Sequence, residues 1–307
     1  MADFALCSVV NDRFVAGYIT MIHTFRRSNS DLNPSLYVIA EKGESFLSGD
    51  KRALIEDACG PVTFLDADPD VYAAVYAGAH SRFGTPPRLM AAFYIFEAFY
   101  RPKERYVLCL DSDIMVTGSF QEILSCPARF AAVRARSARD GAPEEYVNTG
   151  VMWLDIERLG GLGHPERLME QIGSLLPVRG TGLADQAIIN IIWPNQTMFY
   201  LPQNFNFTKR SLMFELTSHD PEAAAAFSTH ELVGTPERMR AIVAEQDVRA
   251  LHFVGEKPWD MKTSAREVAF GAIDELWWNA IYEIGNNAVT ELALDLALLR
   301  RESSLVA

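Results

Sequence analysis

The sequence predicts an α/β fold in which helices flank a mostly parallel central sheet and further helices follow at the C-terminal end. Strand-like and helical segments alternate through the first half of the chain, which is typical of a parallel sheet. Several strand-like segments are apolar throughout, as strands buried on both faces are. The chain has 307 residues, of which 49% are hydrophobic and 22% charged. This length and composition suit one large globular domain.

Four strand-like segments organise the first half of the chain. The predicted strands cover residues 4–10, 35–40, 61–65 and 106–110. Helices are predicted between them at residues 14–28, about 48–58 and about 86–100. The last helix begins at a Pro-Pro pair, and proline is well tolerated in the first turn of a helix. This alternation places helices on both faces of the predicted sheet.

The second half of the chain is less regular. Strands are predicted at residues 130–133 and 150–154, and the polar segment 135–147 is predicted to be a loop. Helices are predicted at residues 165–175, 185–193, 221–227, 236–246, 264–283 and 289–301. We expect one main domain over residues 1–262 and a group of C-terminal helices over residues 263–307.

The charge balance limits the classes of partner. Lys and Arg number 28 and Asp and Glu number 40, so the formal net charge is −12. This argues against nucleic acid as a partner and against broad electrostatic binding to anionic membranes. No secretory leader is apparent, and no apolar run approaches the roughly 20 residues that a membrane span needs. The four cysteines are scattered, so we expect reduced core thiols and a cytoplasmic location.

The C-terminal end carries a concentration of apolar side chains. Trp277, Trp278 and Tyr282 are followed by the Leu-rich segment 292–299. Such a tail can contact a membrane surface or a second copy of the chain in a homodimer. Ordinary helix packing also accounts for it, because aromatic and leucine faces of helices usually belong to the core. We favour packing and keep the other two interpretations open.

The tripeptide Asp111-Ser112-Asp113 follows the predicted strand 106–110 directly. Two neighbouring carboxylates repel each other unless a cation or a proton lies between them. Oxygen ligands suit Mg²⁺ or Mn²⁺, either of which can hold a diphosphate. Two other interpretations stay open: a plain strand-to-turn segment, and a phosphatase whose first Asp is the nucleophile. Phosphatases of that type normally carry the pair after the first strand, whereas several strands precede it here.

Three further motifs are weak when taken singly. The segment 11–14 (Asn-Asp-Arg-Phe) follows the first strand and offers polar groups and a stacking ring, but it also suits a helix cap. Asn148-Thr149-Gly150 can bind sugar hydroxyls through the Asn amide, or simply form a turn. Asp185-Gln186 opens a predicted helix, where an acidic residue is favoured in any case.

The segment 252–259 (His-Phe-Val-Gly-Glu-Lys-Pro-Trp) is more specific. His252 can complete a metal site as a neutral imidazole ligand. Gly255 allows the backbone to approach a phosphate closely, and Lys257 offers a cation to a departing diphosphate. A single His is more often structural than a ligand, but packing alone does not explain this combination.

Together these motifs resemble those of the family 8 glycosyltransferases, which include glycogenin and bacterial lipooligosaccharide galactosyltransferases. The likeness lies in the order of the motifs, from residue 4 to about residue 260. It implies a single nucleotide-sugar-binding domain of the GT-A type and a retaining, metal-dependent transferase. The implied reaction moves a hexose from UDP-glucose or UDP-galactose to a saccharide, a glycoconjugate or another hydroxyl acceptor.

The resemblance also implies roles for individual residues. The implied ligands of Mn²⁺ (or Mg²⁺) are Asp111, Asp113 and His252. The residues implied to act on the reacting groups are Asp185, Gln186 and Lys257. The residues implied to bind the UDP-sugar donor are Val10, Asn11, Phe14, Arg88, Asp111, Ser112, Asp113, Asn148, Gly255 and Lys257.

The chain departs from the family pattern in two places. Phe14 stands where Tyr is usual, which keeps a stacking face but loses a hydroxyl group. The spacing from His252 to Lys257 is one residue shorter than in glycogenin-like members. The alternative function is a catalytically weak UDP-sugar-binding protein, against which the intact acids and His argue.

Overall fold

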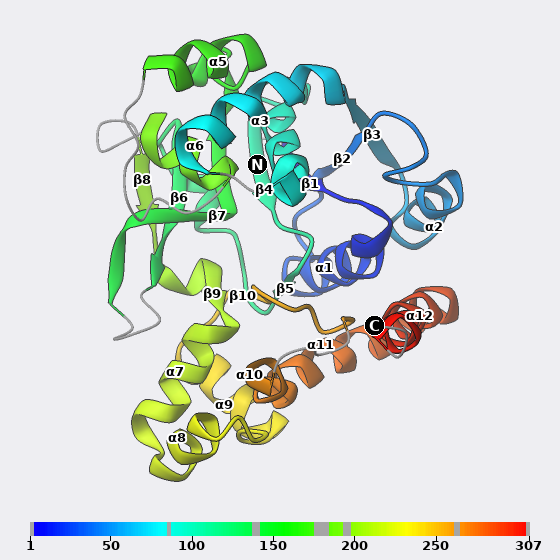
Figure 1. The fold of residues 1–307 in the computed structure, drawn as a ribbon, viewed down its shortest axis with the longest axis vertical. Coiled ribbons are helices and arrows are strands. Elements are labelled where there is room, and N and C mark those ends of the chain that lie inside the picture. Colours follow the sequence, from blue (N-terminus) through cyan, green and yellow to red (C-terminus); the bar gives the residue numbers. More distant parts are fainter. Residues whose placement is uncertain are drawn as a thin grey trace.

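The computed structural model describes residues 3–84, 87–136, 142–174, 184–192, 198–260 and 265–304. These residues form a seven-stranded sheet and a smaller three-stranded sheet, with helices around both (Figure 1). The α/β fold class predicted from the sequence is therefore confirmed.

The large sheet has the strand order β3-β2-β1-β4-β7-β6-β8. Its strands are β1 (Phe4–Val9), β2 (Ser35–Glu41), β3 (Val62–Ala67), β4 (Tyr106–Leu110), β6 (Phe130–Arg136), β7 (Pro143–Asp155) and β8 (Met198–Leu201). Strand β7 runs antiparallel to its neighbours β4 and β6, and the other pairs in this sheet are parallel. The sheet is thus mostly parallel, as predicted.

The strand order reverses at β1 and β4. The chain builds outward from β1 to β2 and β3, then returns to the other side of β1 with β4. Ligands of open α/β sheets bind outside the carboxyl ends of the strands at such a reversal. Hydrogen bonds join the two strand ends here: Ser8 Oγ donates to Leu110 O over 2.7 Å, and Ser112 Oγ donates to Val9 O over 3.3 Å.

The small sheet consists of three very short strands beside the large one (Figure 1). They are β5 (Ile114–Val116), β9 (Phe207–Thr208) and β10 (Ala250–His252), in the order β5-β10-β9. Strand β10 is antiparallel to β5 and parallel to β9. None of them was predicted, because two or three residues cannot show a periodic pattern.

Helices cover both faces of the large sheet, and each face has its own hydrophobic cluster. Successive residues of the inner strands alternate between the clusters, as Leu6 and Cys7 of β1 do. One cluster includes α1 (Val15–Ser28), α2 (Gly49–Cys59), α11 (Gly271–Ile284) and α12 (Asn287–Ser304). The other includes α3 (Pro69–Phe83), the 3₁₀ helix η2 (Pro87–Phe99), α5 (Pro165–Ser174) and α6 (Asp185–Ile192). Burial on both faces explains why the inner strands are apolar throughout.

The remaining helices lie mainly in the second half of the chain. They are α4 (Ile156–Leu159), α7 (Lys209–His219), α8 (Pro221–Ser228), α9 (Pro236–Glu245) and α10 (Ala265–Val268), with the short 3₁₀ turns η1 (Asp12–Phe14), η3 (Ile123–Ser125) and η4 (Gln203–Asn206). Helices α3 and α7 and strand β8 were not predicted. For α3 the signals were present, because Asp68 caps the helix and Pro69 lies in its first turn.

Three predicted elements were wrong in part. Residues 135–136 and 143–147, predicted as loop, belong to β6 and β7, which extend as a hairpin. Pro143 and Glu145 are exposed on this hairpin, and the charges of Glu144 and Glu145 concealed the strand. The predicted helix at residues 264–283 is two helices, α10 and α11, with residues 261–264 outside the described part of the chain. The predicted helix at about 86–100 has 3₁₀ geometry.

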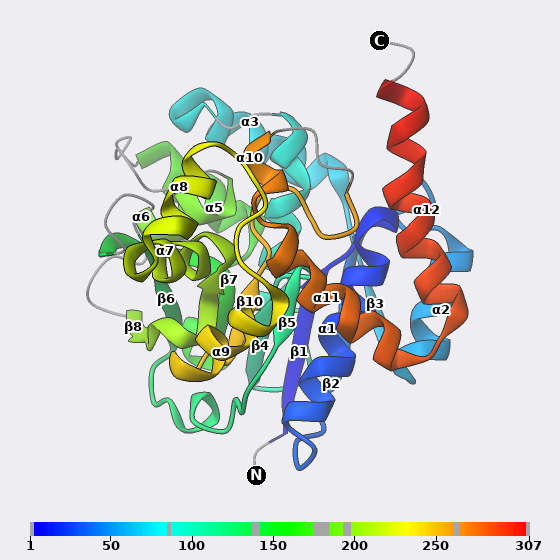
Figure 2. The ribbon, with the colours of Figure 1, turned by 90° about the horizontal axis from the view of Figure 1, so that it is seen from below.

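The C-terminal helices α11 and α12 pack against α1 (Figure 2). Trp277, Val289 and Ala293 are fully buried in the cluster that contains α1, whereas Tyr282 and Leu298 are exposed. Helix packing thus accounts for much of the apolar tail, and nothing in the described residues supports a membrane or dimer contact through it. No helix among the described residues combines the length and hydrophobicity that crossing a membrane requires. The predicted boundary between residues 262 and 263 stays a prediction.

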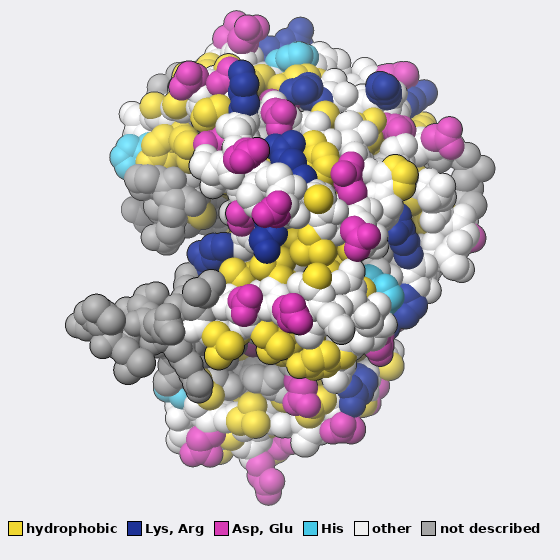
Figure 3. Space-filling view, turned by 90° about the vertical axis from the view of Figure 1, so that its right-hand side faces the viewer, with side chains coloured by type: hydrophobic (Ala, Val, Ile, Leu, Met, Phe, Trp, Pro, Cys, Tyr) yellow, Lys and Arg dark blue, Asp and Glu magenta, His cyan; other side chains and the backbone are white. Residues whose placement is uncertain are grey.

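The surface carries charges of both signs. On the face shown in Figure 3, Lys and Arg side chains are interspersed with Asp and Glu side chains and are not gathered in one patch. The expectation that nucleic acid is not a partner stays a prediction.

Gly17 of α1 allows the helix to pack directly beneath the turn that follows β4. A Cβ atom at this position would lie 2.4 Å from Ser112 O and 2.3 Å from Cη2 of the buried Trp259. We predict that Gly17→Ala lowers the free energy of unfolding by about 1–3 kcal/mol, because neither the backbone nor the indole can move easily. Urea unfolding followed by circular dichroism measures this.

Gly49, in the first turn of α2, provides the matched control. A Cβ there meets only Glu44 Oε1 at 3.7 Å, so Gly49→Ala should be neutral or slightly stabilising. Equal unfolding midpoints for the two variants would contradict the close packing at Gly17.

Candidate active site

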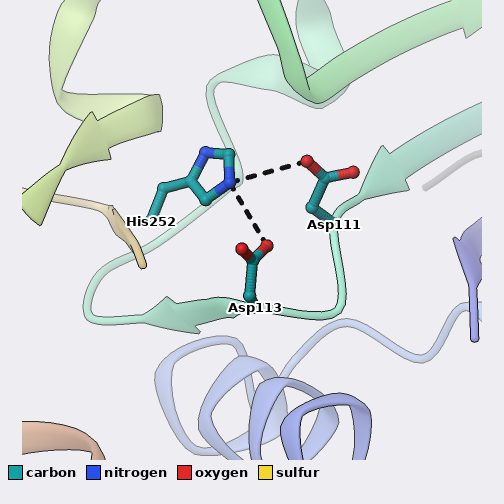
Figure 4. Close-up of side chains that lie close together, drawn as sticks. All are labelled: Asp111, Asp113 and His252. Carbon is teal, nitrogen blue, oxygen red and sulfur yellow. Dashed lines mark ion pairs between the residues drawn. The ribbon is translucent and has the colours of Figure 1, made fainter. Parts of the chain in front are cut away.

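Three side chains from distant parts of the sequence converge beside the carboxyl end of β4. His252 Nε2 lies 3.5 Å from Asp111 Oδ2 and 3.2 Å from Asp113 Oδ1. Figure 4 shows the imidazole nitrogen and both carboxylates directed toward one another. One ligand atom from each residue falls within a group whose members lie within 4.8 Å of one another. The predicted Asp-Asp-His set is therefore present as a cluster that can hold a divalent cation.

The small sheet brings this cluster together. Its register places His252 opposite Ile114, the residue that follows Asp113. Phe253 N donates to Asp113 O over 3.0 Å and continues the pairing beyond the strand. On the other side, Asp111 N donates to Gly150 O over 2.9 Å, which ties the turn to β7. Backbone pairing thus fixes the position of each ligand.

Gly150 leaves room for His252. A Cβ at residue 150 would lie 2.5 Å from Cε1 and 2.7 Å from Nδ1 of that imidazole. The residue lies where the pairing of β6 with β7 slips, between the Ala132–Met152 pair and the Val133–Asn148 pair. Such irregularities redirect side chains and are frequent beside active sites. The turn interpretation of Asn148-Thr149-Gly150 is replaced by an irregular strand.

Burial and neighbouring charged groups shift the pKa values of the two acids in opposite directions. Burial alone would raise the pKa of Asp113, but the Lys257 ammonium and the His252 imidazole outweigh it and hold that pKa well below its usual value. Lys257 Nζ contacts the Asp113 carboxylate and also donates to Phe253 O over 3.1 Å. For Asp111, desolvation raises the pKa, and the nearby Asp113 charge adds to this despite the opposing effect of His252.

Asp185 lies near the cluster at the start of α6. Desolvation, followed by the negative charge of Asp111, raises the pKa of Asp185 to about 7, although the Thr149 hydroxyl donates a hydrogen bond to it. The carboxyl group is thus partly protonated near neutral pH. Its neighbour Gln186 lines the adjoining cavity. The segment 175–183, which includes the Gly-Thr-Gly sequence before Asp185, lies outside the described residues.

The cavity beside the cluster has a volume of about 410 Å³. The predicted site residues Asn148, Gln186 and Gly255 line it, together with Tyr146 and Arg210. Its size is within the range of small-molecule sites, and amide and hydroxyl groups in its walls suit a polar ligand. A second cavity, of about 350 Å³ between β5, α9 and α11, contains none of the predicted site residues.

The segment after β1 lies beside the loop that carries Lys257. Asn11 caps η1 by accepting from Arg13 N over 3.0 Å, as the helix-cap interpretation expected. Phe14 lies edge-on to Trp259 with ring centroids 5.8 Å apart, and Lys257 Nζ lies 5.7 Å from the Phe14 centroid. Val10 is fully buried.

The predicted residues thus gather in one region, with one exception and one addition. Arg88 belongs to η2, but its side chain lies outside the described part of the structure. Asn206 was missed: its Oδ1 lies 2.8 Å from His252 Nδ1, and its Nδ2 donates to Asn148 Oδ1 over 2.7 Å. No motif in the sequence pointed to this asparagine.

Comparison with known proteins identifies a family and a fold. The sequence model described as "Glycosyl transferase family 8" matches residues 6–263. The galactosyltransferase LgtC, crystallised with donor and acceptor sugar analogues, has a TM-score of 0.62 at 17% identity, covering 91% of this chain and 95% of LgtC. At such identities the superpositions show the fold, which is the GT-A glycosyltransferase fold.

Two other solved structures are similar over most of this chain. The bifunctional glycosyltransferase WbbM has a TM-score of 0.62 at 17% identity, covering 97% of this chain and 52% of WbbM. The glycosyltransferase GlyE of Streptococcus pneumoniae TIGR4 has a TM-score of 0.59 at 16% identity, covering 98% of this chain and 64% of GlyE. No curated protein sequence matches the chain.

The raised pKa of Asp185 predicts how stability depends on pH. A carboxyl group with a pKa of about 7 in the folded chain, against about 4 when unfolded, stays protonated in the fold over a range where the unfolded chain has lost the proton. The free energy of unfolding should therefore fall as pH rises from about 4 to 7. In Asp185→Asn this loss is absent, so the variant should gain stability relative to wild type by about 1 kcal/mol or more between pH 5 and pH 8.

Urea unfolding of both proteins in EDTA at the two pH values measures the difference. A stability difference that is the same at pH 5 and pH 8 would contradict the assignment.

Proposed function

Because this chain belongs to glycosyl transferase family 8, we propose that it transfers a hexose from a UDP-sugar to a hydroxyl group of a saccharide or glycoconjugate acceptor, with retention of configuration. UDP-glucose and UDP-galactose are the proposed donors. The observation that carries the proposal is the convergence of Asp111, Asp113 and His252 beside the carboxyl ends of β1 and β4.

The donor set of this cluster fits a divalent cation. Two carboxylates and an imidazole nitrogen face one another, and the two acids repel unless positive charge lies between them. Carboxylate oxygens suit both Mn²⁺ and Mg²⁺, and the nitrogen ligand favours Mn²⁺ over the harder Mg²⁺. When bound there, the cation supplies positive charge for the phosphates of the leaving UDP.

The loop from residue 253 to residue 260 is proposed to bind the diphosphate. Gly255 has a φ of 89°, which favours glycine, and it lines the cavity next to the cluster. Lys257 holds its ammonium group against Asp113, where it can share the negative charge of the leaving group. Arg88 is proposed to face the same diphosphate. Ser112, between the two acids, fixes their turn through its bond to Val9 O.

The nucleoside is proposed to lie at the end of β1, next to the same loop. Asn11 and Phe14 are the proposed contacts, with the backbone of Val10 at the floor. The approach of Lys257 to the Phe14 ring supports this, because it makes the nucleoside and diphosphate subsites adjacent. Trp259, packed edge-on against Phe14, holds that ring in place.

The sugar is proposed to lie between Asn148, Asp185 and Gln186. Retention can proceed through a covalent adduct or by attack of the acceptor on the same face that the leaving group departs from. We favour the second route, in which an oxygen of the leaving phosphate takes the acceptor's proton. A carboxyl group with a pKa of about 7, engaged by Thr149, is a poor nucleophile before the donor arrives. A cytoplasmic location remains part of the proposal.

A panel of UDP-sugars tests the function directly. UDP release is measured with each donor in the presence and absence of Mn²⁺, with simple saccharides as acceptors. Metal-dependent UDP release from UDP-glucose or UDP-galactose supports the proposal. Metal-dependent binding of UDP without turnover of any donor would instead indicate a UDP-sugar-binding protein.

Replacing one ligand tests the cation site. We predict that Asp113→Asn loses transfer activity and loses the Mn²⁺-dependent part of its affinity for UDP, because a neutral amide is a poor ligand and no longer attracts Lys257. Isothermal titration of UDP with and without Mn²⁺ measures this loss.

Asp57→Asn is the control, since Asp57 is exposed on α2 and the substitution changes the net charge equally. If Asp113→Asn turned over donor at the wild-type rate in excess Mn²⁺, the ligand assignment would be wrong.

A further inference from the structure

Asn206 is a buried residue next to the cluster, with 5% of its surface exposed. We propose that it positions two residues at once: the metal ligand His252 and the sugar-binding amide of Asn148. In the chain of hydrogen bonds that passes through Asn206, each donor and each acceptor is fixed by the group before it. The inference rests on the proposed function for the roles of His252 and Asn148, but the direction of the hydrogen bonds follows from geometry alone.

The direction is set by a backbone group. Gly150 N lies 2.9 Å from the side-chain oxygen of Asn148, and a backbone N–H can only donate. The Asn148 atom at this position must therefore be the carbonyl oxygen. The usual ambiguity between the oxygen and the nitrogen of a side-chain amide is resolved here by the main chain.

The position of the Asn148 oxygen fixes the orientation of the Asn206 side-chain amide. The Asn148 oxygen also lies 2.7 Å from the Asn206 amide, and two oxygens would repel at that distance. Asn206 must present its nitrogen to Asn148, which leaves its oxygen toward His252. That oxygen lies 2.8 Å from His252 Nδ1 and can only accept. Nδ1 must therefore carry a hydrogen.

The third step concerns the metal ligand. When Nδ1 of a neutral imidazole carries the hydrogen, Nε2 carries the lone pair. In this structure Nε2 is the atom that faces Asp111 and Asp113 (Figure 4). Asn206 thus selects the tautomer of His252 that can bind a cation, and it also fixes the orientation of the ring. Groups that orient metal-binding histidines in this way typically change metal affinity by about 10–100-fold when they are removed.

The same chain of bonds determines what Asn148 can offer to a ligand. Its oxygen is occupied by Gly150 and Asn206, so its Nδ2 is left to donate. No residue in the described part of the chain accepts from this nitrogen, and Asn148 lines the cavity beside the cluster. Asn148 is therefore a donor toward an acceptor oxygen of the sugar. A displacement of Asn206 would disturb the cation ligand and the sugar contact together.

Two substitutions of Asn206 separate these effects. Asn206→Leu removes both hydrogen bonds, and we expect it to weaken Mn²⁺ binding by about 10–100-fold. Asn206→Asp keeps an oxygen for His252 Nδ1 but cannot donate to Asn148. Its affinities for Mn²⁺ and UDP should be no more than about threefold weaker than those of wild type. Its rate of sugar transfer should nevertheless be lower by about tenfold or more. Electron paramagnetic resonance of free Mn²⁺ gives the affinities.

Asn204→Ala is the matched control from the same 3₁₀ turn. The Asn204 side chain bonds to Asp247, away from the cluster, so this variant should match wild type in Mn²⁺ affinity and transfer. A residue with a purely structural role would not distinguish leucine from aspartate in this way. The proposal would therefore be overturned by wild-type Mn²⁺ affinity in Asn206→Leu, or by an equal loss of affinity in Asn206→Leu and Asn206→Asp.

A measurement without metal keeps the proposal separate from the proposed function. In protein labelled with ¹⁵N-histidine, His252 is assigned by comparison with His252→Gln, at a pH where its ring is neutral. We expect the hydrogen on Nδ1 in wild type and a mixture of tautomers in Asn206→Leu. If wild type bound no Mn²⁺ but showed this change, the proposed function would fail and the hydrogen-bond direction would stand. A wild-type ring with its hydrogen on Nε2 would refute the hydrogen-bond direction whatever the metal affinity.

Discussion

The pairing of β5 with β10 is the constraint on which the site depends. Two acids that follow β4 and a histidine far along the chain become neighbours only because Ile114 pairs with His252 across this small sheet. On its other side His252 pairs with Thr208 of β9, which brings Asn206, at the end of η4 just before that strand, next to the imidazole. Backbone hydrogen bonds set these distances, so the side chains need little freedom to meet. The large sheet positions the two acids at the end of β4, and the small sheet brings His252 next to them.

Charge interactions within the cluster determine how the two acids differ. Asp111 and Asp113 repel each other, and His252 at the end of β10 and Lys257 in the following loop offset this repulsion. The two acids differ as a result: Lys257 and His252 hold the pKa of Asp113 low, while desolvation raises the pKa of Asp111. Asp185 feels the charge of Asp111 as well as its own desolvation. This arrangement suits the divalent cation that is proposed to bind there.

Much of the fold could be predicted from the sequence, and the reasons for the misses are physical. Strands β1, β2 and β4 are buried on both faces, so their apolar runs stand out in the sequence. Strands β5, β9 and β10 are too short to show a pattern, although they assemble the site. The charges of Glu144 and Glu145 concealed a hairpin strand, because a partly exposed strand does not need apolar side chains throughout.

The residues of the candidate site were likewise only partly predictable from the sequence. The carboxylates of Asp111 and Asp113, His252 and Lys257 could be predicted from their residue types, and their order along the chain matched a family. Asn206 could not be found this way, because an asparagine acquires its role only from the partners that the fold gives it. The most direct test of the joint site is anomalous diffraction at the manganese edge from crystals containing Mn²⁺ and UDP. A single peak within coordination distance of Asp111, Asp113 and His252 Nε2 is predicted; a peak elsewhere, with the imidazole turned away from the two acids, would contradict it.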